Sequence, residues 1–250
     1  LLKDQEMHTQ RGKMTGSRIL VFGAHPDDIE FGCGAVLLEA AARGAKIDLV
    51  VLSRGEAGTH GTRSIREKEA LKAAEMMGAV LHFASTPGDT RLQADLDIKL
   101  LAAIEIRRLK PDLVFAPRGH LNQHPDHRET SLLVRDANRL ARYGKTPGLE
   151  NWEPHASRAL LFYDISSEYS GMDGLVPILV DISSQVGKWI DLMKCHESQT
   201  ESLEYVDLQL SRARALGVQA GVNSALRLYS EGPLLWSSIE TVLSSCGPRL

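Results

Sequence analysis

Residues 18–53 read RILVFGAHPDDIEFGCGAVLLEAAARGAKIDLVVLS and combine two kinds of pattern. The apolar runs 18–24 and 46–53 are typical of buried parallel strands. Between these runs, apolar residues recur at helical spacing as far as Gly44, a favourable residue for the end of a helix. The stretch therefore predicts a strand–helix–strand unit, with the polar run His25-Pro26-Asp27-Asp28 directly after its first strand.

The same alternation continues along the chain. Two more strands are expected at 79–85 and 112–117, and three more helices at 64–78, 95–110 and 124–144. Ser64 and Glu67 have the spacing of a capping box at the start of the first of these helices. Segments 159–165 and 177–183 look like further strands, and 184–217 carries two helical stretches. The pattern predicts an α/β fold with a doubly wound, Rossmann-like, mostly parallel sheet and helices on both faces.

Composition is ordinary for a globular protein. The chain has 250 residues, a net charge of −3 and 43% hydrophobic residues, which argues against disorder. A near-neutral balance lacks the basic stripe of a nucleic-acid binder, and no stretch has the length of a membrane helix, so neither partner is expected. Three widely spaced cysteines fit reduced thiols and a cytoplasmic location. Residues 1–13 are expected to be a tail or an expression remnant, and residues 14–250 one domain.

Two polar clusters follow the first and fourth strands. They are His25-Pro26-Asp27-Asp28 and His124-Pro125-Asp126-His127. With the strand order 3-2-1-4 these strands are neighbours, and the crevice at their carboxyl ends is where such folds bind ligands. Taken singly, each cluster also fits a plain turn or a helix cap.

The residue types in the two clusters suit a metal centre. Two histidines and one aspartate would meet the ligand count of a catalytic zinc, which keeps a further position for water. A remaining carboxylate could take a proton from that water, and a remaining histidine could meet an oxyanion or protonate a leaving group.

Several segments are similar to one protein family. Residues 24–28, AHPDD, followed by Glu30, Gly32 and Gly34, resemble the first signature of the LmbE-like, or PIG-L, N-deacetylases, and residues 124–128, HPDHR, resemble the second. The segment 52–78, LSRGEAGTHGTRSIREKEALKAAEMMG, is most similar to bacillithiol-pathway enzymes that act on N-acetylglucosaminyl malate. Residues 194–199, KCHESQ, resemble the HxSQ motif of the family.

The resemblance implies hydrolysis of an N-acetyl group on a small-molecule sugar, and it leaves a homo-oligomer open. The implied ligands of Zn²⁺, or of another divalent transition metal such as Fe²⁺, are His25, Asp28 and His127. Asp27 would be the general base that deprotonates the metal-bound water. His124 would stabilise the tetrahedral intermediate, and Asp126 would hydrogen-bond to His124 and orient it.

Substrate contacts are expected near the same edge of the sheet. Arg54, Arg63 and Arg66 flank the loop after the second strand, and Arg118 follows the fourth; an arginine there could pair with a carboxylate or phosphate on the aglycone, the group attached to the sugar. Arg63 and Arg66 could equally be solvated residues near the start of a helix. Glu56 could be structural or could contact sugar hydroxyls.

Two further segments leave questions open. Residues 145–157 form a loop that could act as a lid. Residues 221–228, GVNSALRL, depart from the family's GVKYAEAF-like wording at Asn223 and Leu226, which would imply a different aglycone if those positions bind substrate.

Four readings of the function therefore remain open. The first is a deacetylase of N-acetylglucosaminyl malate in bacillithiol-type thiol biosynthesis. The second keeps the chemistry but changes the substrate to a thiol conjugate, an antibiotic sugar or a chito-oligosaccharide. The third is a non-catalytic metal-binding protein. The last is a nucleotide-binding protein, which the missing GxGxxG loop disfavours.

Overall fold

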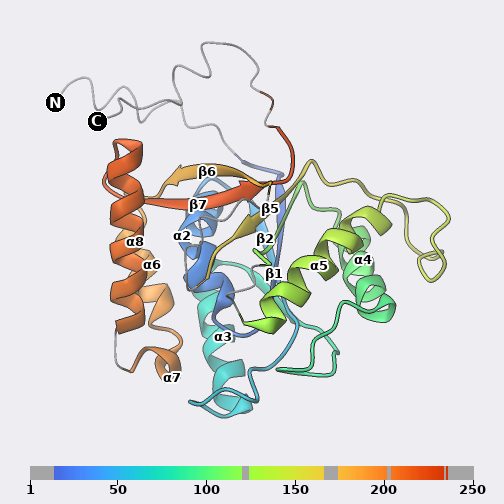
Figure 1. Cartoon of the computed structure of the whole chain (residues 1–250), viewed down its shortest axis with the longest axis horizontal. Coiled ribbons are helices and arrows are strands. Elements are labelled where there is room, and N and C mark those ends of the chain that lie inside the picture. Colours follow the sequence, from blue (N-terminus) through green and yellow to red (C-terminus); the bar gives the residue numbers. More distant parts are fainter. Residues whose placement is uncertain (1–13, 120–123, 166–173, 202–203, 234, 236–250) are drawn as a thin grey trace.

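The computed structural model describes residues 14–119, 124–165, 174–201, 204–233 and 235, so the expected tail at 1–13 lies outside the described residues. Strands β6 and β7 cross the top of the sheet in the view of Figure 1. The sheet has seven strands in the order β3-β2-β1-β4-β5-β7-β6. The first five strands in sequence are parallel, and β7 runs antiparallel to both β5 and β6. This confirms the predicted doubly wound, mostly parallel sheet and its 3-2-1-4 order.

The strands agree with the predicted apolar runs. They are β1 Arg18–Gly23, β2 Lys46–Val51, β3 Val80–Phe83, β4 Leu113–Pro117, β5 Ala159–Tyr163, β6 Val176–Asp181 and β7 Ala225–Ser230. The last strand was not predicted, because residues 221–228 were considered only as a motif. Leu226, one of the two departures from the family wording, packs into the core. The backbone carbonyl of Asn223, the other departure, accepts a hydrogen bond from Arg214 at 2.8 Å.

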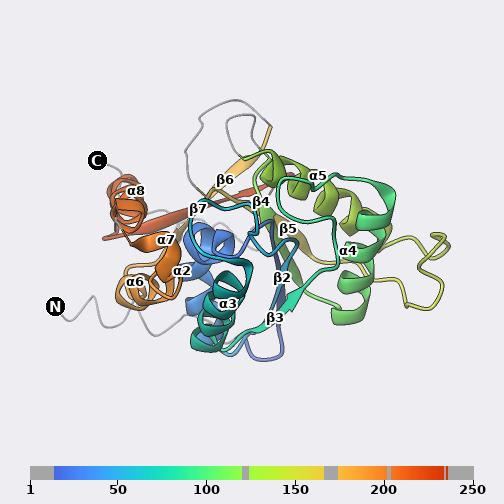
Figure 2. The ribbon, with the colours of Figure 1, turned by 90° about the horizontal axis from the view of Figure 1, so that it is seen from below.

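Helices cover both faces of the sheet (Figure 2). The helices are α2 Asp28–Ala42, α3 Arg63–Met77, α4 Leu96–Leu109, α5 Pro125–Leu140, α6 Val186–Met193, α7 Glu197–Thr200 and α8 Glu204–Ala220. Helices α2, α3, α6 and α8 contribute to one buried apolar cluster, and α4 and α5 to the other. Alternate residues of the central strands enter the two clusters: Ile19 and Val21 the first, Leu20 and Phe22 the second.

One helix start differs from expectation. Helix α3 begins at Arg63, and its N-cap is Thr62, whose hydroxyl accepts from the backbone N–H of Ile65. Ser64 therefore lies inside the helix, and the predicted capping box is wrong. Glu67 instead pairs with Arg54 and Arg63.

The loop 145–157 lies far from the start of α5. It follows the C-terminal end of this 16-residue helix, which is about 24 Å long at 1.5 Å per residue. The buried guanidinium of Arg107 donates to the carbonyls of Leu149 and Trp152 at 2.8 and 2.7 Å and fixes the loop to the body. Because both clusters lie at the other end of α5, the loop is not placed to act as a lid.

Among the described residues, no helix has both the length and the apolar character that a membrane span requires.

Candidate metal and catalytic site

The site forms where β1 and β4 end. The backbone N–H groups of Ala24 and His25 both donate to Oδ2 of Asp28 at 2.8 Å, so the turn after β1 closes on its own aspartate. The other carboxylate oxygen, Oδ1, lies 3.0 Å from Nε2 of His127 in the first turn of α5. The two clusters, 99 residues apart in sequence at this contact, therefore meet in space as the fold rule predicts.

His25, Asp28 and His127 form a suitable set of metal ligands. Their ligand atoms lie within 4.8 Å of one another, and all three residues are buried. Burial opposes the charge on Asp28, but His127 and His25 lower its pKa well below the usual value, so the group is a carboxylate. Two imidazoles and one carboxylate fit a divalent transition metal such as zinc and leave a coordination position for water.

The outer nitrogen of His25 is held by two further carboxylates. Its Nε2 lies 3.1 Å from Oδ1 of Asp89 and 3.2 Å from Oδ2 of Asp126. Oδ2 of Asp126 also accepts from the backbone N–H of Thr90 at 2.7 Å. These contacts orient the ring so that Nδ1 faces Asp28 at 3.6 Å. The carboxylate of Asp126 thus contacts the ring of His25, and the hydrogen bond that the sequence predicted from Asp126 to the ring of His124 is made by its backbone N–H.

Asp89 was missed by the sequence analysis. It is a single acidic residue in the polar stretch after β3, at the same edge of the sheet as the two clusters. Its Oδ2 also accepts from the backbone N–H of Ala57 at 3.1 Å. The signal that could have found it is its position after a neighbouring parallel strand.

Asp27 has an unusual backbone and a poorly hydrated carboxylate. Its φ of 106° lies in the region that L-residues rarely adopt, at the N-cap of α2. Burial raises the pKa of Asp27 to about 6, although the Arg66 guanidinium lowers it. A carboxylate with such a pKa is suited to act as a base near neutral pH.

Arg66 holds this aspartate. It is 5% exposed, and its guanidinium donates to Oδ2 of Asp27 at 3.0 Å, to the carbonyl of Pro26 at 2.7 Å and to that of Gly55 at 3.1 Å. A Cβ on Gly55 would lie 2.3 Å from Nη1 of Arg66, so this close approach requires glycine. Arg66 therefore positions Asp27 and the loop after β2.

His124 lies exposed at the start of α5. It is the N-cap, and its Nδ1 accepts from the backbone N–H of Asp126 at 3.2 Å. Burial of part of the ring and the nearby His25 lower the pKa of His124. The neutral ring therefore carries its proton on Nε2, from which it can donate to a ligand.

The other residues expected to bind substrate are already engaged. Arg54 and Arg63 both pair with Oε1 of Glu67, at 3.0 and 3.1 Å. Glu56 accepts from the backbone N–H groups of Arg54 and Asp89, at 2.8 and 3.1 Å, so it ties two loops together. The sequence alone left this structural role of Glu56 open.

Arg118 belongs to a separate aromatic cluster. It is 4% exposed, its guanidinium lies 4.0 Å above the ring of Tyr229, and Nη1 lies 3.6 Å from Asp164. Tyr229 in turn donates to Asp164 at 2.7 Å.

The KCHESQ segment, residues 194–199, contacts helix α3 and the loop before it. The backbone N–H and the hydroxyl of Ser198 each donate to Glu69 on α3 at 2.7 Å, and Gln199 donates to the carbonyl of His60 at 2.9 Å. His196 is fully buried, with Nε2 3.4 Å from Glu30. The motif thus supports the loop and helix that carry Arg66.

A doubly wound sheet with a two-histidine, one-aspartate cluster in its crevice is typical of metal-dependent enzymes. The model of the PIG-L family, GlcNAc-PI de-N-acetylase, matches residues 20–138, which include every residue of the two clusters. The chain belongs to this family.

Individual relatives are similar to this chain in sequence or in structure. The uncharacterized deacetylase YaiS of Escherichia coli is 34% identical over 125 residues, 49% of this chain and 66% of that protein. The 4-oxalmesaconate hydratase of Pseudomonas putida is 25% identical over 85% of this chain and 86% of its own. The crystal structure of the conserved protein TT1542 from Thermus thermophilus has a TM-score of 0.78 and 34% identity, covering 87% of this chain and 96% of that one.

Proposed function

We propose that this chain is a zinc-dependent hydrolase that removes the N-acetyl group of a GlcNAc-type glycoside, leaving a free amine and acetate. The observation that carries the proposal is the metal-ligand set of His25, Asp28 and His127 beside the partly buried carboxylate of Asp27. N-acetylglucosaminyl malate is the substrate that the wording of residues 52–78 favours.

The residues around the metal-ligand cluster have different roles in the proposed reaction. A divalent cation held there would polarise the amide carbonyl and acidify a water molecule. Asp27, held by Arg66, takes the proton of the attacking water. His124 donates a hydrogen bond from Nε2 to the carbonyl oxygen as negative charge develops on it. The proton that Asp27 took from the water then passes to the departing amine, which leaves as the neutral free amine.

The test separates the base from the metal ligands. Asp27→Asn should lower acetate release by about 10²–10⁴-fold, the usual contribution of a general base, while the protein keeps one metal per chain. Asp28→Asn should lose the metal as well as the activity. Acetate release from N-acetylglucosaminyl malate and from N-acetylglucosamine is measured with and without a chelator, alongside metal content by elemental analysis.

One result would show that the proposed deacetylase function is wrong. Wild-type protein that carries one metal and releases acetate from none of the N-acetyl sugars, including antibiotic sugars and chito-oligosaccharides, would overturn the proposal.

A second candidate function is the addition of water to a carbon–carbon double bond. The relative named 4-oxalmesaconate hydratase matches 85% of this chain and favours it. The same base could serve, because both reactions begin with proton removal from water. Loss of ultraviolet absorbance from an unsaturated dicarboxylate, without acetate release from sugars, would support this second function.

A further inference from the structure

Two carboxylates converge on one ring nitrogen of His25. Oδ1 of Asp89 and Oδ2 of Asp126 lie 3.1 and 3.2 Å from Nε2, whereas Nδ1 faces Asp28. A neutral imidazole that binds a metal through Nδ1 carries its one proton on Nε2, so a single N–H is shared between two carboxylates. The outer side of His25 therefore has more negative charge than the ring can neutralise.

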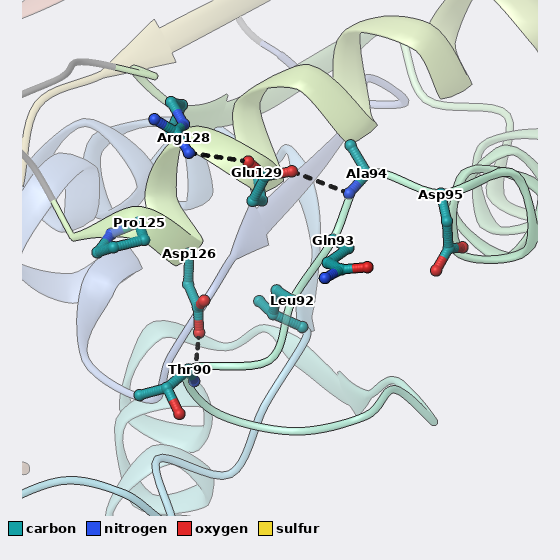
Figure 3. A pocket seen from close by; sticks show the side chains of 9 residues that line it. All are labelled: Thr90, Leu92, Gln93, Ala94, Asp95, Pro125, Asp126, Arg128 and Glu129. Carbon is teal, nitrogen blue, oxygen red and sulfur yellow. Dashed lines mark hydrogen bonds and ion pairs between the residues drawn. The ribbon is translucent and has the colours of Figure 1, made fainter.

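Apart from His25, the partners that the described chain gives these carboxylates are backbone N–H groups. Oδ2 of Asp89 accepts from Ala57 at 3.1 Å, and Oδ2 of Asp126 accepts from Thr90 at 2.7 Å (Figure 3). In the part of the chain that the structure describes, neither carboxylate pairs with a lysine or an arginine. Asp89 and Asp126 are only 7% and 1% exposed, so water screens their charges poorly. Two buried carboxylates held at one nitrogen favour the binding of a cation.

The donor atoms around this charge suit a divalent transition metal. The ligand atoms of His25, His124 and Asp126 lie within 4.8 Å of one another. Two atoms that each bind a tetrahedral zinc at about 2.0–2.1 Å lie about 3.3 Å apart. The 3.1 and 3.2 Å between Nε2 of His25 and the two carboxylates are close to that spacing. Two imidazoles and two carboxylates thus offer as many donors as a four-coordinate zinc requires.

This set of donors has an exposed member. His124 at the start of α5 is exposed, and its ring centroid lies 4.6 Å from that of His25. An ion can therefore reach the ring of His124 from solvent, although the other three donors are buried.

We propose that His25, His124, Asp89 and Asp126 form a second metal site, the outer metal site, for a divalent ion such as zinc. His25 would bind the first ion through Nδ1 and the second through Nε2. The second ion displaces the Nε2 proton to solvent, so the outer metal site is the weaker of the two and fills only in excess metal.

Occupancy of the outer metal site has a consequence that rests on the proposed function. An ion that binds His124 occupies the ring that donates to the carbonyl oxygen of the substrate. Excess zinc should therefore inhibit acetate release, whereas the second binding event itself does not depend on which reaction the protein catalyses.

The stoichiometry of metal binding tests the outer metal site. Metal-free wild-type protein is dialysed against a series of free zinc concentrations, and bound zinc per chain is measured by elemental analysis. We expect two steps, with one ion per chain in the first and a second ion at higher free zinc. A single step that ends at one ion per chain would overturn the proposal.

A substitution locates the second ion. His124→Asn removes the imidazole but keeps a residue that is favourable at a helix N-cap. It should leave the first step in place and weaken the second by at least about tenfold, the lower end of the cost of losing even an indirect partner of a metal. His60→Asn, the same change at an exposed histidine outside the cluster, is the matched control for zinc bound at the surface. A second step that His124→Asn shifts no more than His60→Asn does would refute the placement.

Cobalt(II) gives a readout of the shared ring. Two ions that bind opposite nitrogens of one imidazole are coupled magnetically, so the electron paramagnetic resonance signal of the first cobalt should lose intensity as the second binds. Signals that simply add would show that the two ions share no ligand, contrary to the proposal.

The outer metal site and the proposed function fail separately. Two-step binding by a protein that releases no acetate would overturn the deacetylase function and leave the site standing. Acetate release by a protein that binds one zinc per chain throughout would do the reverse. If both hold, acetate release should fall over the same range of free zinc as the second step, and unchanged release would overturn the predicted inhibition.

Discussion

His25 has a different partner on each ring nitrogen. Nδ1 faces Asp28, whereas Nε2 faces Asp89 and Asp126 at 3.1 and 3.2 Å. Carboxylates that hold the outer nitrogen of a metal-binding histidine fix its tautomer and increase its basicity. The two outer aspartates are therefore placed to orient the ring for a metal held by His25, Asp28 and His127. The ligand atoms of His25, His124 and Asp126 also lie within 4.8 Å of one another, so Asp126 borders a second possible set of ligands.

We expect Asp126→Asn to weaken zinc binding by about 10–100-fold, the usual effect of losing such a partner. Competition against a chromophoric chelator measures the affinity. Asp136→Asn, at a half-exposed position on the same helix, is the control. Equal affinity of the two variants would contradict this role of Asp126.

The guanidinium of Arg66 gives a second prediction. Arg66→Lys keeps the charge but cannot reproduce the three bonds of a planar fork to Asp27 and two carbonyls. We expect kcat for acetate release to fall about 10–100-fold through misplacement of the base, with KM and metal content little changed. The control is Arg139→Lys, an exposed residue on α5. A rise in KM at constant kcat would instead indicate that Arg66 binds substrate.

The sequence identified the residue types of the site better than their contacts. A metal site in the two clusters could be predicted because both clusters follow adjacent strands, whereas the choice of His25, Asp28 and His127 as its ligands came from the family resemblance. The contact of Asp126 with His25 could not be predicted, because it depends on which side chain of a helical turn faces the first strand. Asp89 is a single acid among polar residues, so only the position of its loop in space reveals it.

At the scale of elements, α7 supports α3 through Ser198 and Glu69. The approach is close at Gly61, which has φ +76° and where a Cβ would lie 2.7 Å from Oγ of Ser198. Gly78 has a similar φ of +69° but no heavy atom within 4 Å of such a Cβ. A comparison of alanine substitutions at these two glycines therefore distinguishes the effect of backbone strain from the effect of steric crowding.

We expect Gly61→Ala to destabilise the protein more than Gly78→Ala, by about 1–3 kcal/mol. Both changes place alanine at positive φ, but only the first also forces α7 away. Urea denaturation of the two variants measures the difference. Equal losses would show that Ser198 moves aside freely.

Elements were predictable where hydrophobic periodicity was strong. The runs at 18–24, 46–53 and 112–117 contain continuous apolar stretches that are typical of buried strands. Strand β7 was missed because Ala225–Ser230 includes Arg227 and lies in a segment valued for its motif. The start of α3 was misplaced because Thr62 and Ser64 are both suitable caps, and the turn geometry decides between them.

At the scale of the molecule, the metal would join the two halves of the sheet's crevice. Because a metal that binds only the folded chain stabilises it by mass action, saturation at about 1,000 times Kd adds about 4 kcal/mol. A chelator should therefore lower the melting temperature, and added zinc should restore it. Asp28→Asn protein should show neither change; a chelator effect that persists in this variant would place the stabilising metal elsewhere.

The separation of Asp28 and His127 by 99 residues also bears on the order of folding. A chain cannot complete the ligand set until β1 and β4 have paired, which closes a long loop of sequence. The metal can therefore bind to all three ligands only late in folding, after the central strands of the sheet have paired. The ion should therefore slow unfolding and leave the rate of refolding nearly unchanged, as expected for an interaction that forms after the transition state.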